Sequence, residues 1–308
     1  MFHRRLARTP LLSLALAGAL VGPLGAPATA QAAQRVPAVQ AAPAVRPLAA
    51  PSVSCRAATG FLALPSGDLY EVSDPNVLGG TGNLTRGARV GSSWTTSDFA
   101  WMGAGGDGVL YGLTWGGQLR WYRWDAGDRS WDPASGRVVG TGFTPIKGIV
   151  NIGLGVEGRF YVVRPNGRLV EFEHTGWHTG SATWEDRQGE QIGLGWKSTD
   201  VIVPVGDGSL YLQRAGSLHW YRHTLPGDGP TIWRTRLVGS GWSMYAIGSA
   251  GGGVLYTTGG PDGQVKLYQH LDPADGAAQW TAPQGVAKGL SDEPDSLGVV
   301  IDPTTCSA

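Results

Sequence analysis

The chain has 308 residues, in which 24 Lys and Arg balance 24 Asp and Glu to give a formal net charge of zero. A chain with so few charges and no basic excess offers no stripe for a nucleic acid and no patch for an anionic membrane. Its 49 Gly and 13 Trp are the unusual counts. They favour many short strands joined by tight turns.

The first thirty residues have the features of a secretory signal. Three Arg form a basic start, residues 11–21 (LLSLALAGALV) are apolar, and residues 28–30 (ATA) give an A-x-A cleavage site. The apolar stretch is shorter than the roughly 20 residues that span a bilayer. We therefore expect residues 1–30 to be removed and the mature protein to be secreted and extracellular, by the general secretory or the twin-arginine route.

Residues 31–54 consist mainly of Ala, Pro, Val and Gln without a helix or strand period, which is typical of an extended linker. The folded part then covers residues 55–308, long enough for one sizeable core. Cys55 and Cys306, the only cysteines, lie at its two ends. In an exported protein they favour a disulfide that joins those ends. Free thiols and metal ligands are the alternatives, but no matching pair of His supports zinc.

An internal repeat dominates the folded part. The segment VLY at 109–111 returns as RFY at 159–161, SLY at 209–211 and VLY at 254–256, with a blurred first copy, FLA, at 61–63. A Gly-containing turn precedes each of the four clear copies. The copies are 45 to 50 residues apart and divide the chain into repeats of about 61–108, 109–158, 159–208, 209–253 and 254–302.

Each repeat contains the same order of elements. After the first strand comes a second, such as LRWYRW (119–124), then a loop with a Trp, then a third strand ending in a motif such as VGSGW (238–242). A short apolar fourth strand follows, as in GIVNIG (148–153) or VIVPVG (201–206). Alternating residues and Gly turns indicate antiparallel meanders. The sequence therefore predicts an all-β fold, a five-bladed β-propeller of four-stranded antiparallel blades.

Two other architectures fit less well. A solenoid would need atypical capping repeats, whereas here the two ends meet through the cysteines. A barrel with helices would need a 3.6-residue period between the strands, and none is present.

Two of the repeats resemble those of a known family. WYRHTLPGDGPTIW with VGSGW, and HTGWHTGSATW with IGLGW, are similar to segments of the tachylectin-2 family of five-bladed propeller lectins. The resemblance covers about residues 55–305. It implies one sugar pocket per blade, with N-acetylated hexosamines of the GlcNAc or GalNAc type as ligands. The chain departs from the pattern at residues 69–75 (LYEVSDP) and at Leu290, so working pockets are expected in repeats 109–158, 159–208 and 209–253.

Three histidines occupy one position of the repeat, at the end of the second strand. They are His174, His223 and His270, and the same position holds Trp124 and Asp74 in the other two repeats. A metal site needs several converging ligands, whereas residues at one position of different blades point apart. A structural role, with each imidazole bonded to a neighbouring loop, and contact with a bound ligand both stay open.

Large aromatic residues fill two further positions. The residues that close the third strand are expected to fill the wedge between adjacent sheets: Trp94, Phe143, Trp196 and Trp242. The Trp of the loop before that strand can either pack in the core or stack on a sugar ring while its N–H reaches a hydroxyl. We expect Trp184→Ala, in this second group, to weaken one site without unfolding the ring.

Small polar residues in the same loops supply hydrogen bonds suited to neutral sugars, although Ser, Thr and Asp also build turns. The candidate ligand-binding residues are Trp124, Asp125, Trp131, His174, Ser181, Trp184, His223, Asp228, Trp233, His270 and Trp280.

The sequence favours a binding protein over an enzyme. Glycoside hydrolysis needs two carboxylates across one site, but Asp107, Glu157 and Asp207 form a repeated turn position that is spread around the ring. No nucleophile elbow, H-E-x-x-H or P-loop motif is present. We expect a secreted, multivalent lectin without cofactor or metal that binds glycans bearing N-acetylhexosamines, with a monomer as the simplest oligomeric state.

Two alternatives remain. One is a propeller for protein interaction whose sugar pockets have degenerated. The other is an enzyme, which would need a single non-repeated cluster of acidic residues or His at the axis or on one face.

Overall fold

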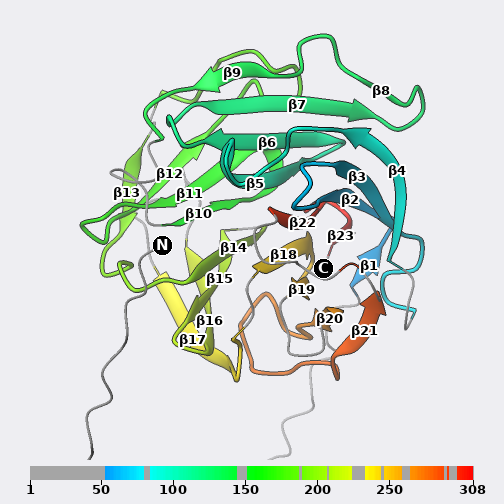
Figure 1. Cartoon of the computed structure of the whole chain (residues 1–308). Coiled ribbons are helices and arrows are strands. Elements are labelled where there is room, and N and C mark those ends of the chain that lie inside the picture. The colour runs from blue at the N-terminus through cyan, green and yellow to red at the C-terminus, as the bar shows by residue number, and fades with distance from the viewer. Residues whose placement is uncertain are drawn as a thin grey trace, which may run out of the picture. The chain divides into compact units, whose positions relative to one another are not determined.

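The computed structural model describes residues 53–79, 84–143, 151–186, 189–206, 208–223, 233–243, 246–258, 264–287, 290 and 297–307. They form five small sheets around a common axis (Figure 1). The predicted all-β, five-bladed propeller with four-stranded antiparallel blades is confirmed. The predicted signal peptide and nearly all of the predicted linker lie outside the described residues. Within the described ranges, no helix is long and apolar enough to cross a membrane.

The first two blades, with strands given from the axis outward, contain the N-terminal half of the ring. Blade 1 consists of β22 (Gly298–Ile301), β2 (Ala58–Ala63), β3 (Leu69–Asp74) and β4 (Thr85–Gly91). Blade 2 consists of β5 (Phe99–Gly106), β6 (Val109–Thr114), β7 (Leu119–Asp125) and β9 (Arg137–Gly140), with the short β8 (Ser130–Trp131) paired to the end of β7.

The other three blades follow in chain order. Blade 3 consists of β10 (Asn151–Leu154), β11 (Arg159–Val163), β12 (Leu169–Glu173) and β13 (Glu190–Gly193), with the single 3-10 turn η1 (Val156–Gly158) after β10. Blade 4 consists of β14 (Val201–Gly206), β15 (Ser209–Arg214), β16 (Ser217–His223) and β17 (Trp233–Ser240). Blade 5 consists of β18 (Ala246–Gly251), β19 (Val254–Thr258), β20 (Val265–Gln269) and β21 (Gln284–Ala287).

The blades are offset by one strand from the sequence repeats. The segments GIVNIG and VIVPVG, interpreted as fourth strands of their repeats, contribute β10 and β14, which are the innermost strands of the next blades. The same offset carries β22 from the C-terminal end of the chain into blade 1, where it pairs with β2. The ring is therefore closed by strands from both ends of the domain.

The predicted disulfide between Cys55 and Cys306 is present. It joins β1 (Ser54–Cys55) to β23 (Cys306–Ser307), and β23 also pairs with the inner strand of blade 5 at Gly251. The cross-link closes a sequence separation of 251 residues, for which the chain-entropy model gives roughly 5 kcal/mol of stabilisation.

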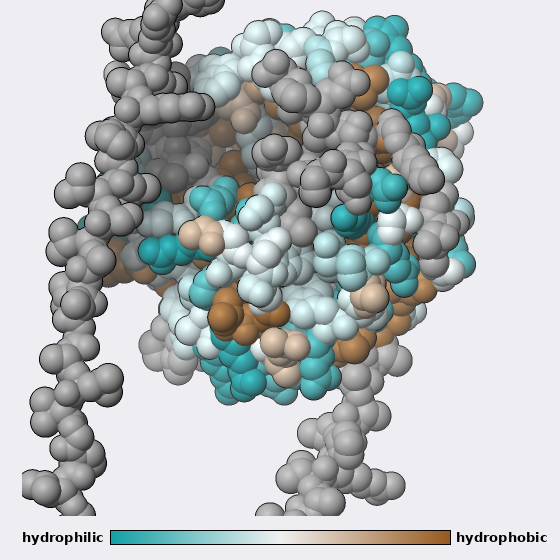
Figure 2. All heavy atoms as spheres, turned by 60° about the horizontal axis from the view of Figure 1, so that its bottom comes forward, coloured by the Kyte–Doolittle hydropathy of each residue, from teal (hydrophilic) through white to brown (hydrophobic). Residues whose placement is uncertain are grey.

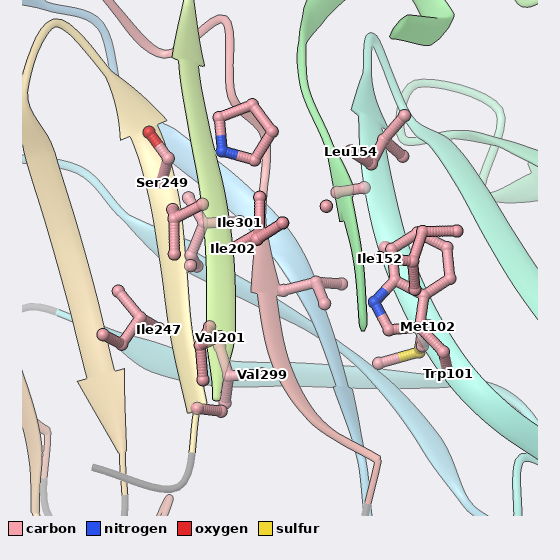
Figure 3. A pocket seen from close by; sticks show the side chains of 18 of the residues that line it. Trp101, Met102, Ile152, Leu154, Val201, Ile202, Ile247, Ser249, Val299 and Ile301 are labelled. Carbon is pink, nitrogen blue, oxygen red and sulfur yellow. The ribbon is translucent and has the colours of Figure 1, made fainter. Parts of the chain in front are cut away.

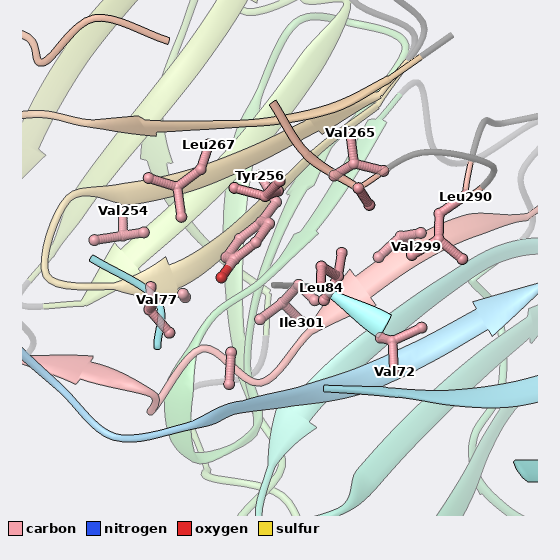
Figure 4. Close-up of a cluster of buried hydrophobic side chains, with 14 of the residues drawn as sticks. Val72, Val77, Leu84, Val254, Tyr256, Val265, Leu267, Leu290, Val299 and Ile301 are labelled. Carbon is pink, nitrogen blue, oxygen red and sulfur yellow. The ribbon is translucent and has the colours of Figure 1, made fainter. Parts of the chain in front are cut away.

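The hydrophobic core lies between the blades, because alternate residues of each strand point to opposite faces of the sheet. Five buried clusters occupy the five spaces between neighbouring blades, which we call junctions and number by their blades. At junction 5–1, Val254 and Tyr256 of β19 contact the cluster that includes Val72 of β3 (Figure 4). On the face shown in Figure 2, apolar residues of the described surface occur only in small separate groups.

The innermost strands surround an axial cavity of about 360 Å³. Its wall is mostly apolar and includes Met102, Ile152, Ile202, Ile247 and Ile301, one from each blade (Figure 3). The polar side chains that were singled out in the sequence lie elsewhere, at the junctions.

Candidate functional site

A buried tyrosine and a buried histidine connect blades 2 and 3. The hydroxyl of Tyr111 in β6 lies 2.7 Å from Nδ1 of His174, and Nε2 of that imidazole lies 2.7 Å from the carbonyl oxygen of Ser181. Burial lowers the pKa of His174, although the hydrogen bond to Ser181 opposes this. A neutral ring that donates from Nε2 and accepts the tyrosine O–H at Nδ1 satisfies both contacts.

The same contact recurs around the ring. Tyr161 pairs with His223 at 3.1 Å, and Tyr211 pairs with Nδ1 of His270, whose Nε2 bonds the carbonyl of Ala277. At junction 5–1, the hydroxyl of Tyr256 donates to Asp74 at 3.0 Å. The structure thus gives these positions the structural role, with the ring nitrogens of His174 and His270 already bonded inside the protein. Direct contact of the three histidines with a sugar stays a prediction.

The Trp residues of the loops form a second connection between blades, nearer the rim. Each indole Nε1 donates to a backbone carbonyl in the outer strand of the preceding blade. The four pairs are Trp131 with Val90 (2.6 Å), Trp184 with Val139 (2.7 Å), Trp233 with Ile192 (2.5 Å) and Trp280 with Val238 (2.7 Å). We call this series of contacts the outer seam. Because these N–H groups are bonded, a sugar hydroxyl would have to compete for them, although the rings stay partly exposed.

The wedge residues are buried as expected. Trp94, Phe143, Trp196 and Trp242 are 5 to 7% exposed and contact the aromatic residues of the next blade. Trp242, for example, lies with its ring centroid 4.7 Å from that of Tyr268 and 5.2 Å from that of Trp280. Trp184 packs in the same way beside Phe143 and His174, so Trp184→Ala removes a junction contact and not only a surface ring.

Two fully buried indoles that the sequence did not single out hold loops of the following blade. Trp121 donates from Nε1 to the carbonyl of Trp177 at 2.6 Å, and Trp220 donates to that of Pro273 at 2.9 Å. Gly180 and Gly276 lie flat on these two indoles at positive φ, where an added Cβ would come within 2.4 and 2.3 Å of the rings. The signal available was a Trp at the third position of both second strands.

The remaining candidate residues lie in turns. Asp125 is exposed, and its Oδ1 accepts the N–H groups of Gly127 and Asp128. The hydroxyl of Ser181 bonds Thr183 within its own loop, while its carbonyl serves His174. Asp228 lies outside the described residues. In the described part of the chain, no group of three or more His, Cys, Asp or Glu side chains is placed to hold a metal ion.

Cavities are present at two junctions and occupy equivalent places in them. The cavity at junction 1–2 has a volume of about 550 Å³ and that at junction 4–5 about 340 Å³. Each lies between the Gly-rich turn that leads to the second strand of one blade and the middle strands of the preceding blade. Trp124 and Asp125 line the first, and Pro273 and Ala274 line the second. Sequence candidates thus reach the first cavity but are replaced by loop neighbours in the second.

Comparisons with known proteins agree with this architecture. The model of the family described as Tachylectin matches residues 63–293, which include strands from all five blades. No curated protein matches the chain.

Solved structures match at low identity. One comes from work on the de novo evolutionary emergence of a symmetrical protein (18% identity, TM-score 0.47, 75% of this chain and 94% of that chain). Another is a triple mutant of AofleA from Arthrobotrys oligospora (14%, TM-score 0.38, 78% and 76%). A third is a Trichoderma reesei protein of carbohydrate-active enzyme family AA12 (12%, TM-score 0.38, 82% and 86%). With TM-scores below 0.5, these likenesses carry no argument about function.

Proposed function

We propose that this chain, which belongs to the tachylectin family of lectin-type propellers, is a secreted, multivalent and non-catalytic lectin for N-acetylated amino sugars of the GlcNAc or GalNAc type. The family match is the observation that carries the proposal, because it covers strands of every blade. The predicted signal peptide and the disulfide between Cys55 and Cys306 are consistent with an oxidising, extracellular location.

The junction cavities are the sites that we assign to the sugar. Their volumes of about 550 and 340 Å³ lie within the range of small-molecule sites. At junction 1–2 the wall combines aromatic Phe61 and Trp124 with the polar groups of Thr59, Ser73 and Asp125. An apolar platform with a few polar groups around it is what recognition of a sugar ring requires.

Several sites on one rigid ring support multivalent binding. Two cavities lie at non-adjacent junctions, so a surface that displays many sugars can engage both. Linked weak sites gain roughly 10²–10⁴ in apparent affinity when the geometry permits simultaneous contact. Binding to a dense glycan surface should therefore exceed binding to a free monosaccharide by a factor of that order.

A glycan array probed with residues 31–308 tests the proposal. We expect binding to chitooligosaccharides or to other glycans with terminal N-acetylhexosamine. Trp124→Ala should lower the signal, whereas Trp115→Ala should leave it unchanged, because Trp115 is 44% exposed and lines none of the three cavities. An array without any bound glycan would favour the interaction propeller with degenerate pockets.

One observation bears on the enzyme alternative. Glu71, Asp107, Asp125 and Asp302 line the cavity at junction 1–2 and have no counterpart at junction 4–5, which is a non-repeated acidic cluster. Asp302 is occupied, however, by Arg56 and by the backbone and hydroxyl of Thr304, and Asp125 caps a turn. Incubation with chitooligosaccharides should release no shorter sugars, and the appearance of such products would contradict the non-catalytic proposal.

A further inference from the structure

Junction 1–2 departs from the other junctions at its centre. Where the other blades place a tyrosine, blade 1 has Ala63, and where its partner would be a His or Asp, blade 2 has Trp124. A small residue thus faces a large one in place of the hydrogen-bonded pair. Both residues belong to the aromatic cluster of this junction, with Trp124 only partly buried.

The third position of the second strand also differs. Glu71 of β3 stands where blades 2 and 4 have the loop-holding Trp121 and Trp220. Its Oε1 lies 2.5 Å from Nε1 of Trp124, which donates to it. The following loop of blade 2 folds back as a hairpin, in which Asp125 pairs with Ser130 of β8. These three differences coincide with the largest of the three cavities, about 550 Å³.

The charge of this cavity is acidic. Four carboxylates line it, from Glu71, Asp107, Asp125 and Asp302, against one guanidinium, that of Arg123. Arg123 donates to the carbonyl of His178 in blade 3. Arg56 lies outside the lining and forms ion pairs with Asp302 at 3.1 Å and with Asp107 at 3.8 Å. Glu71 and Asp125 therefore have no cationic partner among the described residues.

The equivalent cavity at junction 4–5 has the opposite character. Among its described lining residues there is no acidic side chain, and Arg222 is the only charged one. Its lining is otherwise Gly, Val, Pro, Ala and small polar residues, with the disulfide Cys306. Two cavities at the same place in the fold thus differ in the sign of their charge.

We propose that the cavity at junction 1–2 takes a hexosamine unit whose amino group is free and protonated, as in a de-N-acetylated chitin oligomer. The ammonium group has three N–H donors that suit carboxylate acceptors at Glu71 and Asp125, and the indole of Trp124 adds a cation–π contact. Acetylation removes the charge and adds bulk at the same atom. The proposal rests on the proposed lectin function and assigns a different sugar to this one site.

The experiment measures binding of chitotriose and of tri-N-acetylchitotriose by calorimetry to residues 31–308. Glu71→Gln keeps an oxygen for the Trp124 N–H, and Asp125→Asn keeps the oxygen that caps its turn, so each variant removes charge with little change of shape. Each should weaken chitotriose binding by about tenfold or more and leave tri-N-acetylchitotriose binding within about twofold. Asp128→Asn, an exposed carboxylate outside the cavity, is the matched control and should change neither.

The outcomes separate the two proposals. Absence of binding to tri-N-acetylchitotriose with intact binding of chitotriose would contradict the proposed specificity of the protein but support this assignment. Equal losses for both sugars, or no loss in Glu71→Gln and Asp125→Asn, would overturn the assignment, as would wild-type binding of oligolysine as strong as that of chitotriose. Circular dichroism and thermal unfolding of each variant confirm that the ring has folded.

Discussion

Junctions 2–3 and 1–2 show what the ring requires and what it can vary. At junction 2–3, the Tyr111–His174 pair, the bond from Trp121 to the loop carbonyl of Trp177 and the outer seam at Trp184 are all present. At junction 1–2, only the outer seam remains, from Trp131 to Val90. The inner contacts there are replaced by Ala63, Trp124 and Glu71, and a cavity results.

The outer seam is the constant element of this comparison. Even at junction 5–1, where no Trp is present, the backbone N–H of Leu84 donates to the carbonyl of Val286, in the outer strand of the preceding blade, at 3.0 Å. The inner contacts differ from one junction to the next. The difference indicates that the seam serves the ring, whereas the centre of a junction is free to become a binding site.

The largest expected effect comes from the buried indole of the closed junction. Trp121 is 0% exposed, so Trp121→Ala should lower the free energy of unfolding by about 3–5 kcal/mol, from lost burial and the cavity left behind. Trp124→Ala at the open junction should cost clearly less, because its ring already borders a cavity. Urea unfolding of both variants measures the difference, and equal losses would contradict the contrast between the two junctions.

Removing one hydroxyl tests the inner pair. Tyr111→Phe leaves Nδ1 of the buried His174 without its donor and should cost about 1–3 kcal/mol of unfolding free energy. Tyr70→Phe is the control, because Tyr70 is half-buried below the guanidinium of Arg86 and outside the junction pairs. A loss in Tyr70→Phe as large as that in Tyr111→Phe would show that the hydroxyl contact is not what stabilises junction 2–3.

The outer seam should respond alike at both junctions. Trp184→Phe and Trp131→Phe each keep an aromatic ring but remove the N–H that bonds Val139 or Val90. Each should cost about 1 kcal/mol by chemical denaturation. A clear difference between the two variants would mean that the seam, too, depends on the centre of the junction.

The smallest effect is a pH dependence at the closed junction. Burial lowers the pKa of His174 in the folded chain, so the unfolded chain binds the extra proton first as the pH falls below about 6.5. The stabilisation is therefore complete above that pH and is lost on acidification. The urea midpoint of the wild type should fall between pH 7.5 and 5.5 more steeply than that of His174→Gln. Replacement of the exposed His178 by Gln should leave the slope unchanged.

The sequence predicts the fold well because the repeat records it directly. The anchor strands, the wedge residues such as Trp94 and the pairing of Cys55 with Cys306 all follow from position and spacing. The phase of the blades does not, since GIVNIG belongs to one repeat by sequence and to the next blade by hydrogen bonding. A strand forms its sheet with whichever neighbour lies closest, and a repeat unit carries no mark of where that boundary falls.

The candidate site was predictable only in part. Trp124 and Asp125 line a cavity as expected of ligand-binding residues, but His174 is used inside the protein, and Glu71 was not considered. One signal for the inner pair was present in the sequence: each repeat that follows a Tyr such as Tyr111 has His or Asp at the paired position, and the one that follows Ala63 has Trp124. Cavities depend on how loops fold back, which local spacing does not determine.

The β22 strand has a consequence for how the ring is made. Blade 1 is begun by the first folded residues to be synthesised and is finished by some of the last, so β2 keeps an open edge until the chain is complete. A copy cut short before residue 298 would retain that edge, and an open edge is a template for strands of other chains. Exchange of β22 between two copies would satisfy both rings at once, so the end that seals one molecule is also the segment through which two can become entangled.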